Sequence, residues 1–271
     1  MLGFFAAFAV LAILLDVIPG RLVPPGHWWR SAGRGLIGLS AVPLLAALLI
    51  YAGVLRLPGW DRRRVGVPAG RTAVRGAARG LLWGVGLAAA VLAVCVVGGA
   101  RVTLGPAFGE SYLPVAAPVM VGLVLAALLE ELLFRGMPLA RLAEAVGPVA
   151  ASVALTVAFV VAHVGNPAVS GLGLANVGLA SLVLSAAFFS AGGLPAAFGL
   201  HVGWNAGLAL AADAPVSGLR LGLPVVEYLP GPRGWLTGGA FGPEGGAAAT
   251  VVLAGALTWW ATRHRAREVA A

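Results

Sequence analysis

The sequence predicts an all-α membrane protein built as a bundle of about eight transmembrane helices. Hydrophobic residues fill 60% of the 271 positions and charged residues only 10%, whereas soluble domains carry about 25% charged residues. A soluble core of this size cannot bury so much apolar surface, so the excess must face lipid. Several apolar stretches approach the roughly 20 residues that a helix needs to cross a bilayer. We assign them as helices because a lipid-exposed backbone must satisfy its own hydrogen bonds.

Eight apolar segments organise the chain. They are roughly 2–18, 36–57, 81–100, 114–134, 149–164, 177–191, 196–213 and 247–262. We divide the chain into three parts on this basis. Residues 1–113 hold the N-terminal transmembrane helices with an arginine-rich cytoplasmic loop, and residues 114–213 form a helix core. Residues 214–271 provide an external loop, rich in Pro and Gly, and a C-terminal transmembrane helix.

The basic residues indicate orientation. The net charge is +8, and all 18 basic residues are arginines. They lie mainly in short loops between apolar segments, as the positive-inside rule requires, so we expect the lipid bilayer as partner and no nucleic acid. The arginines at 62–79 place their loop in the cytoplasm. Counting segments from there, we expect an integral protein of a bacterial cell membrane with both termini in the cytoplasm.

A small ionisable cluster lies within or at the margin of the apolar segments between residues 111 and 213. Its members are Glu130, Glu131, Arg135, His163 and His201. Ionisable residues inside a membrane are costly, so a functional site is the default hypothesis. Glu131 and Arg135 are four residues apart and share a helix face, whereas Glu130 points about 100° away. We therefore expect Arg135 to fix Glu131 while Glu130 faces a polar cavity within the membrane.

The histidines belong to two further helical pairs. Phe159 and His163 are four residues apart, and so are His201 and Asn205. If the chain between Glu131 and His163 forms a helical hairpin, the two lie at similar depth. His201 enters the bilayer from the same side, where a cleft open to the cytoplasm is expected. The simplest structural alternative, a buried ion pair joining two helices, leaves Glu130 unexplained.

These residue types form a workable hydrolytic set. A glutamate and a histidine can activate water, and histidine and asparagine donors can stabilise an oxyanion. A metal is a rival account, because Glu130, His163 and His201 are types that hold catalytic Zn²⁺. The His-Glu-x-x-His signature of zinc proteases does not occur in the sequence. The sequence alone leaves both possibilities open, a divalent metal such as Zn²⁺ or no cofactor.

The three motifs resemble those of the CPBP family of intramembrane proteases. That family includes prenyl-protein (CAAX) endopeptidases and bacteriocin-processing or self-immunity proteins with the ABI domain. Its pattern is Glu-Glu-x-x-x-Arg, Phe-x-x-x-His and His-x-x-x-Asn or Asp, which here reads Glu130 to Arg135, Phe159 to His163 and His201 to Asn205. Asn166 is a further frequent feature. The resemblance covers roughly residues 115–212.

The resemblance implies a role for each matching residue. Glu130 would be the base that activates water, with His163 beside it, and His201 with Asn205 would form the oxyanion hole. Glu131, Arg135, Phe159 and Asn166 would support the site. It also implies an eight-helix bundle around a cavity and a membrane-associated peptide or protein as substrate. We do not assume that the substrate is prenylated.

Two other functions fit the same cluster. A non-enzymatic membrane scaffold or bacteriocin self-immunity protein would keep the buried polar residues without using them for hydrolysis. A proton-coupled transporter would use intramembrane Glu and His as a relay. No transporter-type internal repeat is visible in the sequence, so we rank the transporter last. The leading prediction is an intramembrane endopeptidase.

Overall fold

The computed structural model of the chain describes residues 32–105, 112–223 and 225–269, with side chains described as far as residue 262. The first predicted segment, 2–18, lies outside these residues. Within them the chain is mostly helical. The long helices are α3 (Ala32–Val54), α4 (Gly70–Val97), α5 (Leu113–Phe134), α6 (Met137–Val146), α7 (Pro148–Ala162), α8 (Gly171–Phe188), α9 (Gly193–Ala212) and α11 (Ala247–Val269).

Four stretches of the described chain are long and apolar enough to cross a membrane. They are Ala32–Val54, Arg63–Val97, Leu113–Val146 and Gly171–Phe188. Two shorter apolar helices cover Pro148–Ala162 and Ala247–Thr262. A mostly helical protein with four candidate membrane-spanning stretches is therefore confirmed within the described residues, while the total of eight transmembrane helices stays a prediction.

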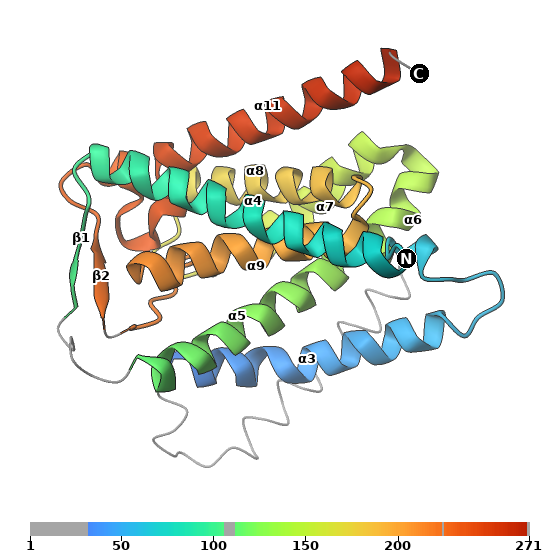
Figure 1. Cartoon of the computed structure of the whole chain (residues 1–271), viewed down its shortest axis with the longest axis horizontal. Coiled ribbons are helices and arrows are strands. Elements are labelled where there is room, and N and C mark those ends of the chain that lie inside the picture. Colours follow the sequence, from blue (N-terminus) through green and yellow to red (C-terminus); the bar gives the residue numbers. More distant parts are fainter. Residues whose placement is uncertain (1–31, 106–111, 224, 270–271) are drawn as a thin grey trace.

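The bundle has α4 and α9 at its centre (Figure 1). These two helices run side by side over most of their length, and α3 pairs with α5 on one side of them. On the other side α8 packs against α9, and α11 packs against α8 and α4. The helix α7 packs against α8, so the three predicted motifs, on α5, α7 and α9, converge inside the bundle.

Small residues explain why α4 and α9 pack so closely. Gly76, Gly80 and Gly84 recur every four residues and so share one face of α4. A Cβ atom added to Gly80 would lie 2.1 Å from the carbonyl oxygen of Ala196 on α9. One added to Gly203 on α9 would lie 2.3 Å from the carbonyl oxygen of Leu81. The backbones therefore touch, as small residues permit in membrane helices, and this contact fixes the position of α9.

A tyrosine from α3 fixes the end of α5. The Tyr51 hydroxyl donates to the Leu132 carbonyl oxygen at 2.7 Å and accepts from the Met137 amide at 2.6 Å. It thereby joins the last turn of α5 to the first residue of α6. A Cβ atom at Gly136 would lie 1.9 Å from the same hydroxyl, so the junction has room only for glycine.

Residues 214–246, predicted as an external loop, fold back onto the bundle. The segment contains β2 (Val226–Leu229), the short helix α10 (Gly234–Thr237) and two 3₁₀ turns, η3 (Gly239–Phe241) and η4 (Pro243–Gly245). Strand β2 pairs antiparallel with β1 (Arg101–Leu104), which follows α4. The segment buries apolar side chains, including Leu223, Tyr228 and Phe241. This burial explains why a Pro- and Gly-rich stretch is ordered as part of the core.

Candidate active site

The C-terminal turn of α5 presents two adjacent glutamates in different surroundings. Residues next to each other on a helix point about 100° apart. The Glu131 side chain is fully buried, whereas the Glu130 side chain is 30% exposed and lines an internal cavity. Helix geometry thus separates the two carboxylates, as the sequence predicts.

Glu131 is held by a buried ion pair. Its Oε1 atom accepts a hydrogen bond from Arg135 Nη1 at 3.2 Å, and only 1% of the Arg135 side chain is exposed. Arg135 terminates α5, and its backbone amide bonds to the Glu131 carbonyl oxygen. Removing one partner of such a pair leaves a buried charge without compensation, which costs about 3–5 kcal/mol. The pair therefore fixes the end of α5.

His201 on α9 lies between the two glutamates. Its Nδ1 atom is 2.9 Å from Glu131 Oε1, and its Nε2 atom is 3.8 Å from Glu130 Oε2. A carboxylate only accepts hydrogen bonds, so Nδ1 carries the proton that is donated to Glu131. The Nε2 atom then faces the cavity and Glu130. Helix spacing pairs His201 with Asn205, and the structure adds both glutamates as its neighbours.

An aromatic stack connects Arg135 to His163. The guanidinium carbon of Arg135 lies 4.1 Å from the centre of the Phe159 ring. The ring centres of Phe159 and His163 are 4.4 Å apart. His163 Nδ1 is 2.7 Å from the Phe159 carbonyl oxygen, so it donates there and leaves Nε2 for the cavity. Phe159 thus contacts both the Arg135 guanidinium group and the His163 ring.

The two asparagines of the predicted set have different surroundings. Asn205 is buried, lies one turn beyond His201 on α9 and lines the cavity. Asn166 also lines the cavity, but its Nδ2 atom donates to the Ser217 carbonyl oxygen at 3.1 Å. Asn166 therefore anchors the loop after His163 to the segment that follows α9.

All these motifs open onto one cavity of about 390 Å³. Its wall is mainly apolar, with leucine, valine and alanine side chains from α3, α5, α8, α9 and α11. Its polar and aromatic lining comprises Glu130, Phe134, Phe159, His163, Asn166, Asn176, His201, Trp204, Asn205, Ser217 and Glu244. Glu131 and Arg135 are not among the residues that line it, which agrees with a supporting place behind the wall.

One lining group escaped the sequence analysis. Glu244 in η4 is only 9% exposed and accepts hydrogen bonds from the Trp204 indole at 2.7 Å and from the Ser217 amide. Glu244 lies beyond residues 111–213, the stretch that holds the ionisable cluster predicted from the sequence. The available signal was a carboxylate that directly precedes the last apolar segment, within a stretch predicted to lie outside the membrane.

The described residues show no group suited to a metal ion. In ranges 32–105, 112–223 and 225–262, no three His, Cys, Asp or Glu side chains are arranged to hold one. His201 Nδ1 is bonded to Glu131 and His163 Nδ1 to the Phe159 carbonyl oxygen, and these bonds orient the Nε2 atom of each ring. The geometry thus leaves the two Nε2 atoms and Glu130 as the groups that face the cavity.

Comparison with known proteins identifies the segment that carries this site. Residues 112–207 match the model of the type II CAAX prenyl endopeptidase Rce1-like family. Neither the curated proteins nor the solved structures compared with the chain gave a match. The family match contains all eight residues that the sequence singled out, and it supports a membrane-embedded CAAX-type endopeptidase. Residues 112–207 are therefore similar to the Rce1-like CAAX protease family.

Proposed function

We propose that the chain is an intramembrane endopeptidase that hydrolyses a peptide bond of a membrane-associated substrate with water activated by Glu130. The observation that carries this proposal is the contrast between the two glutamates. Glu131 is bonded to Arg135 and His201 through Oε1, although its Oε2 has no hydrogen bond among the described residues. Glu130 Oε2 likewise has none there, and its nearest charged neighbour is His201 Nε2 at 3.8 Å. A carboxylate at a cavity wall that is not engaged in such hydrogen bonds is available as a general base.

The proposed reaction balances on these groups. Glu130 takes a proton from water as the water oxygen bonds to the scissile carbonyl carbon, and an oxyanion forms. The carbon–nitrogen bond then breaks as Glu130 returns the proton to the leaving amine. His163 accepts a hydrogen bond from the same water at Nε2 and helps to orient it. His163 bonds to Phe159 through Nδ1, so its Nε2 atom is free for this role.

Asn205 and His201 supply the proposed oxyanion hole. The Asn205 amide is a donor on the same face of α9, one turn from the His201 ring. A ring protonated on both nitrogens donates Nδ1–H to Glu131 and Nε2–H to the cavity. Donors aimed at the oxyanion are worth about 3–4 kcal/mol each in a site that excludes water. Glu131 and Arg135 then act by fixing the ring that carries one of them.

The cavity wall suits an apolar substrate segment. Most of its lining is aliphatic, and its polar groups come from α5, α8, α9, the residues that follow α7 and the segment that follows α9. We therefore infer a substrate whose scissile bond lies beside an apolar peptide segment or a lipid-modified C-terminus. The proposed orientation, with the arginine-rich loop and both termini in the cytoplasm of a bacterial cell, would deliver such a substrate from the cytoplasmic side.

The test is cleavage by the full chain purified in detergent. The probes are a peptide library and a fluorescence-quenched peptide ending in Cys-aliphatic-aliphatic-X, in farnesylated and unmodified forms. Glu130→Gln should abolish cleavage while thermal unfolding stays unchanged. Glu144→Gln is the matched control, because Glu144 forms an exposed ion pair with Arg141. Full cleavage by the Glu130 variant would remove the base assignment.

The same experiment also tests whether cleavage requires a metal ion. Metal analysis of the purified protein and cleavage with and without a chelator separate two mechanisms. Cleavage that survives chelation in a protein without bound metal supports Glu130 acting alone on water. Activity that is lost on chelation and restored by Zn²⁺ would instead assign Glu130, His163 and His201 as ligands.

A further inference from the structure

Glu244 lines the cavity but lies outside the segment that matches the family. Both oxygens of its buried carboxylate are used. Oε1 accepts from Trp204 Nε1 at 2.7 Å, and Oε2 accepts from the backbone amide of Ser217. Hydrogen bonds to a charged group are among the stronger ones in proteins. One side chain thus joins α9 to the turn that follows it.

The backbone of Glu244 is fixed as firmly as its side chain. The Asn176 side-chain amide on α8 donates to the carbonyl oxygens of Glu244 at 2.7 Å and Gly246 at 2.9 Å. Asn176 is itself held, because its Oδ1 atom accepts from the Thr250 hydroxyl on α11 at 2.7 Å. The η4 turn is therefore linked to two helices, which fixes the backbone from which the Glu244 carboxylate extends.

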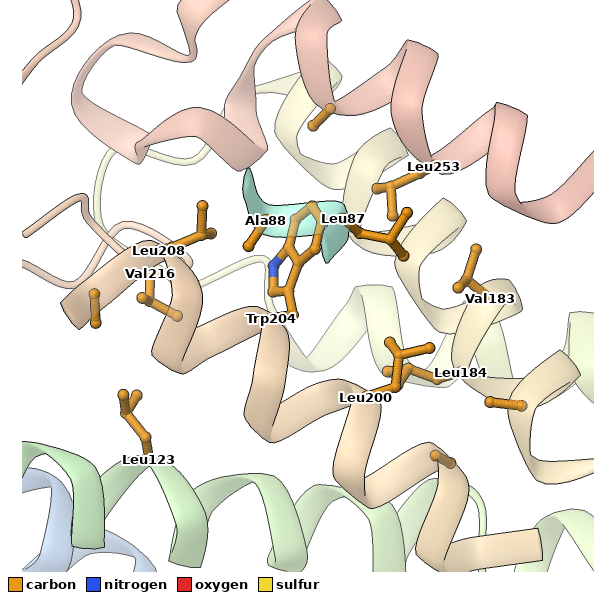
Figure 2. Close-up of a cluster of buried hydrophobic side chains, with 14 of the residues drawn as sticks. Leu87, Ala88, Leu123, Val183, Leu184, Leu200, Trp204, Leu208, Val216 and Leu253 are labelled. Carbon is orange, nitrogen blue, oxygen red and sulfur yellow. The ribbon is translucent and has the colours of Figure 1, made fainter. Parts of the chain in front are cut away.

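Both groups that Glu244 holds form part of the cavity wall. Trp204 precedes Asn205 on α9 and extends from that helix toward Leu87 and Ala88 of α4 (Figure 2). Ser217 lines the cavity too, and its carbonyl oxygen accepts from Asn166. Asn166 lies three residues after His163. Glu244 thus holds two parts of the cavity wall. One is next to the predicted motif of α9, and the other is bonded to the loop that follows the predicted motif of α7.

We propose that Glu244 is a positioning residue that sets the shape of the substrate cavity by holding Trp204 and the Ser217 turn in place. The proposal rests on the proposed endopeptidase function and adds a residue that determines substrate fit. Glu244 takes no part in the proton transfers assigned to Glu130. Its loss should therefore weaken substrate binding while the chemical step of bound substrate changes little.

The kinetic test separates binding from chemistry. Glu244→Gln keeps the size of the side chain but places an amide donor against either the Trp204 N–H or the Ser217 N–H. The KM for the quenched peptide should rise on the order of tenfold, the change that one lost hydrogen bond to a charged group corresponds to. The kcat should stay within about twofold of that of the unsubstituted protein. Glu244→Asp keeps both acceptor oxygens, so its KM should lie between those of the unsubstituted protein and Glu244→Gln.

Two further variants identify the route of the effect. Trp204→Phe keeps an aromatic ring but removes the N–H that Glu244 accepts, so it should raise KM in the same way. The double variant should be less impaired than the product of the single effects, because both remove the same hydrogen bond. Glu227→Gln is the matched control, since Glu227 belongs to the same segment but lies in β2, away from the cavity lining.

A thiol-labelling measurement tests the proposal without substrate. Ser217→Cys places a cysteine in the held turn, and the native Cys95 is buried and serves as an unreactive reference. Maleimide labelling at position 217 should be severalfold faster when Glu244→Gln is added, and unchanged with Glu227→Gln. If the unsubstituted protein cleaves no peptide, the endopeptidase function fails while this measurement still judges the role of Glu244.

Two results would overturn the proposal. The first is unchanged labelling at position 217 together with an unchanged KM in Glu244→Gln. The second is a fall in kcat alone, which would place Glu244 in the chemical step. If Glu244→Gln does not fold, Trp204→Phe and Glu244→Asp decide the question through the same KM and labelling readouts.

Discussion

Glu131 Oε1 on α5 lies 2.9 Å from His201 Nδ1 on α9, although the two residues are 70 positions apart in the chain. The same oxygen accepts from Arg135 at 3.2 Å. One carboxylate oxygen therefore links two helices and holds a proton on Nδ1 of the His201 ring. It also explains how Arg135 can support the proposed catalytic site without lining the cavity.

The buried ion pair should matter far more for stability than its exposed counterpart. Glu131→Ala leaves Arg135 buried without its charge partner, and we expect a loss of about 3–5 kcal/mol in the free energy of unfolding. Glu144→Ala removes an ion pair whose side chains are 36% and 52% exposed, and it should cost less than about 1 kcal/mol. Thermal unfolding in the same detergent measures both. Equal shifts in Tm would contradict a structural role for the Glu131 pair.

The contact between α4 and α9 predicts a sharp contrast between two glycines of α4. Gly80→Ala places a Cβ atom 2.1 Å from the Ala196 carbonyl oxygen, so α9 must move and carry His201 with it. Gly86→Ala meets nothing within 4 Å and should stabilise α4 by up to about 1 kcal/mol, because alanine favours helix over glycine. We expect a lower Tm and reduced cleavage for the first and normal cleavage for the second. A Tm for Gly80→Ala equal to that of the unsubstituted protein would refute the close contact.

Local spacing made part of this site predictable from sequence. Residues four apart on a helix share a face, so the Glu131–Arg135 pair and the placement of Phe159 beside His163 follow from the chain itself. The link between Glu131 and His201 does not, because it depends on how α5 and α9 pack. The close approach of α4 to α9 needed the pattern of small residues to be matched between two helices that are far apart in the chain.

The surroundings of Glu244 could not be predicted from the sequence for a different reason. Its hydrogen bonds join Asn176 on α8, Trp204 on α9 and the Ser217 amide, and none of these partners is near Glu244 in the sequence. A Pro- and Gly-rich stretch without helical periodicity gives no signal of burial. Such a stretch becomes part of the core only because apolar side chains such as Phe241 find a place against α7 and α8.

The hydroxyl of Tyr51 should be needed for the geometry at the end of α5. Tyr51→Phe leaves the Leu132 carbonyl and the Met137 amide without that hydroxyl, and each loss of a buried partner costs about 1–3 kcal/mol. We expect a lower Tm and a reduced kcat, because Glu130 and Arg135 flank Leu132. Tyr112→Phe is the control, since it removes a longer 3.3 Å bond to Leu210 at a part-buried site. Similar effects of the two variants would contradict the special role of Tyr51.

The stack on Phe159 leads to the last prediction. The ring contacts the Arg135 guanidinium on one hand and the His163 ring on the other. A desolvated cation–π contact is worth about 2 kcal/mol, and a leucine side chain cannot supply it. Phe159→Leu should therefore loosen Arg135 and free the His163 ring to turn.

Phe188→Leu is the matched control for this change. Phe188 is also a buried phenylalanine with an aromatic neighbour, Phe189, but it does not line the cavity. The two variants lose comparable packing, so we expect similar decreases in Tm. Only Phe159→Leu should lower kcat for the quenched peptide, because only Phe159 touches groups assigned to the site. A kcat reduced equally by both would show that the effect is general loosening of the bundle, and Phe159 would then lose its supporting role.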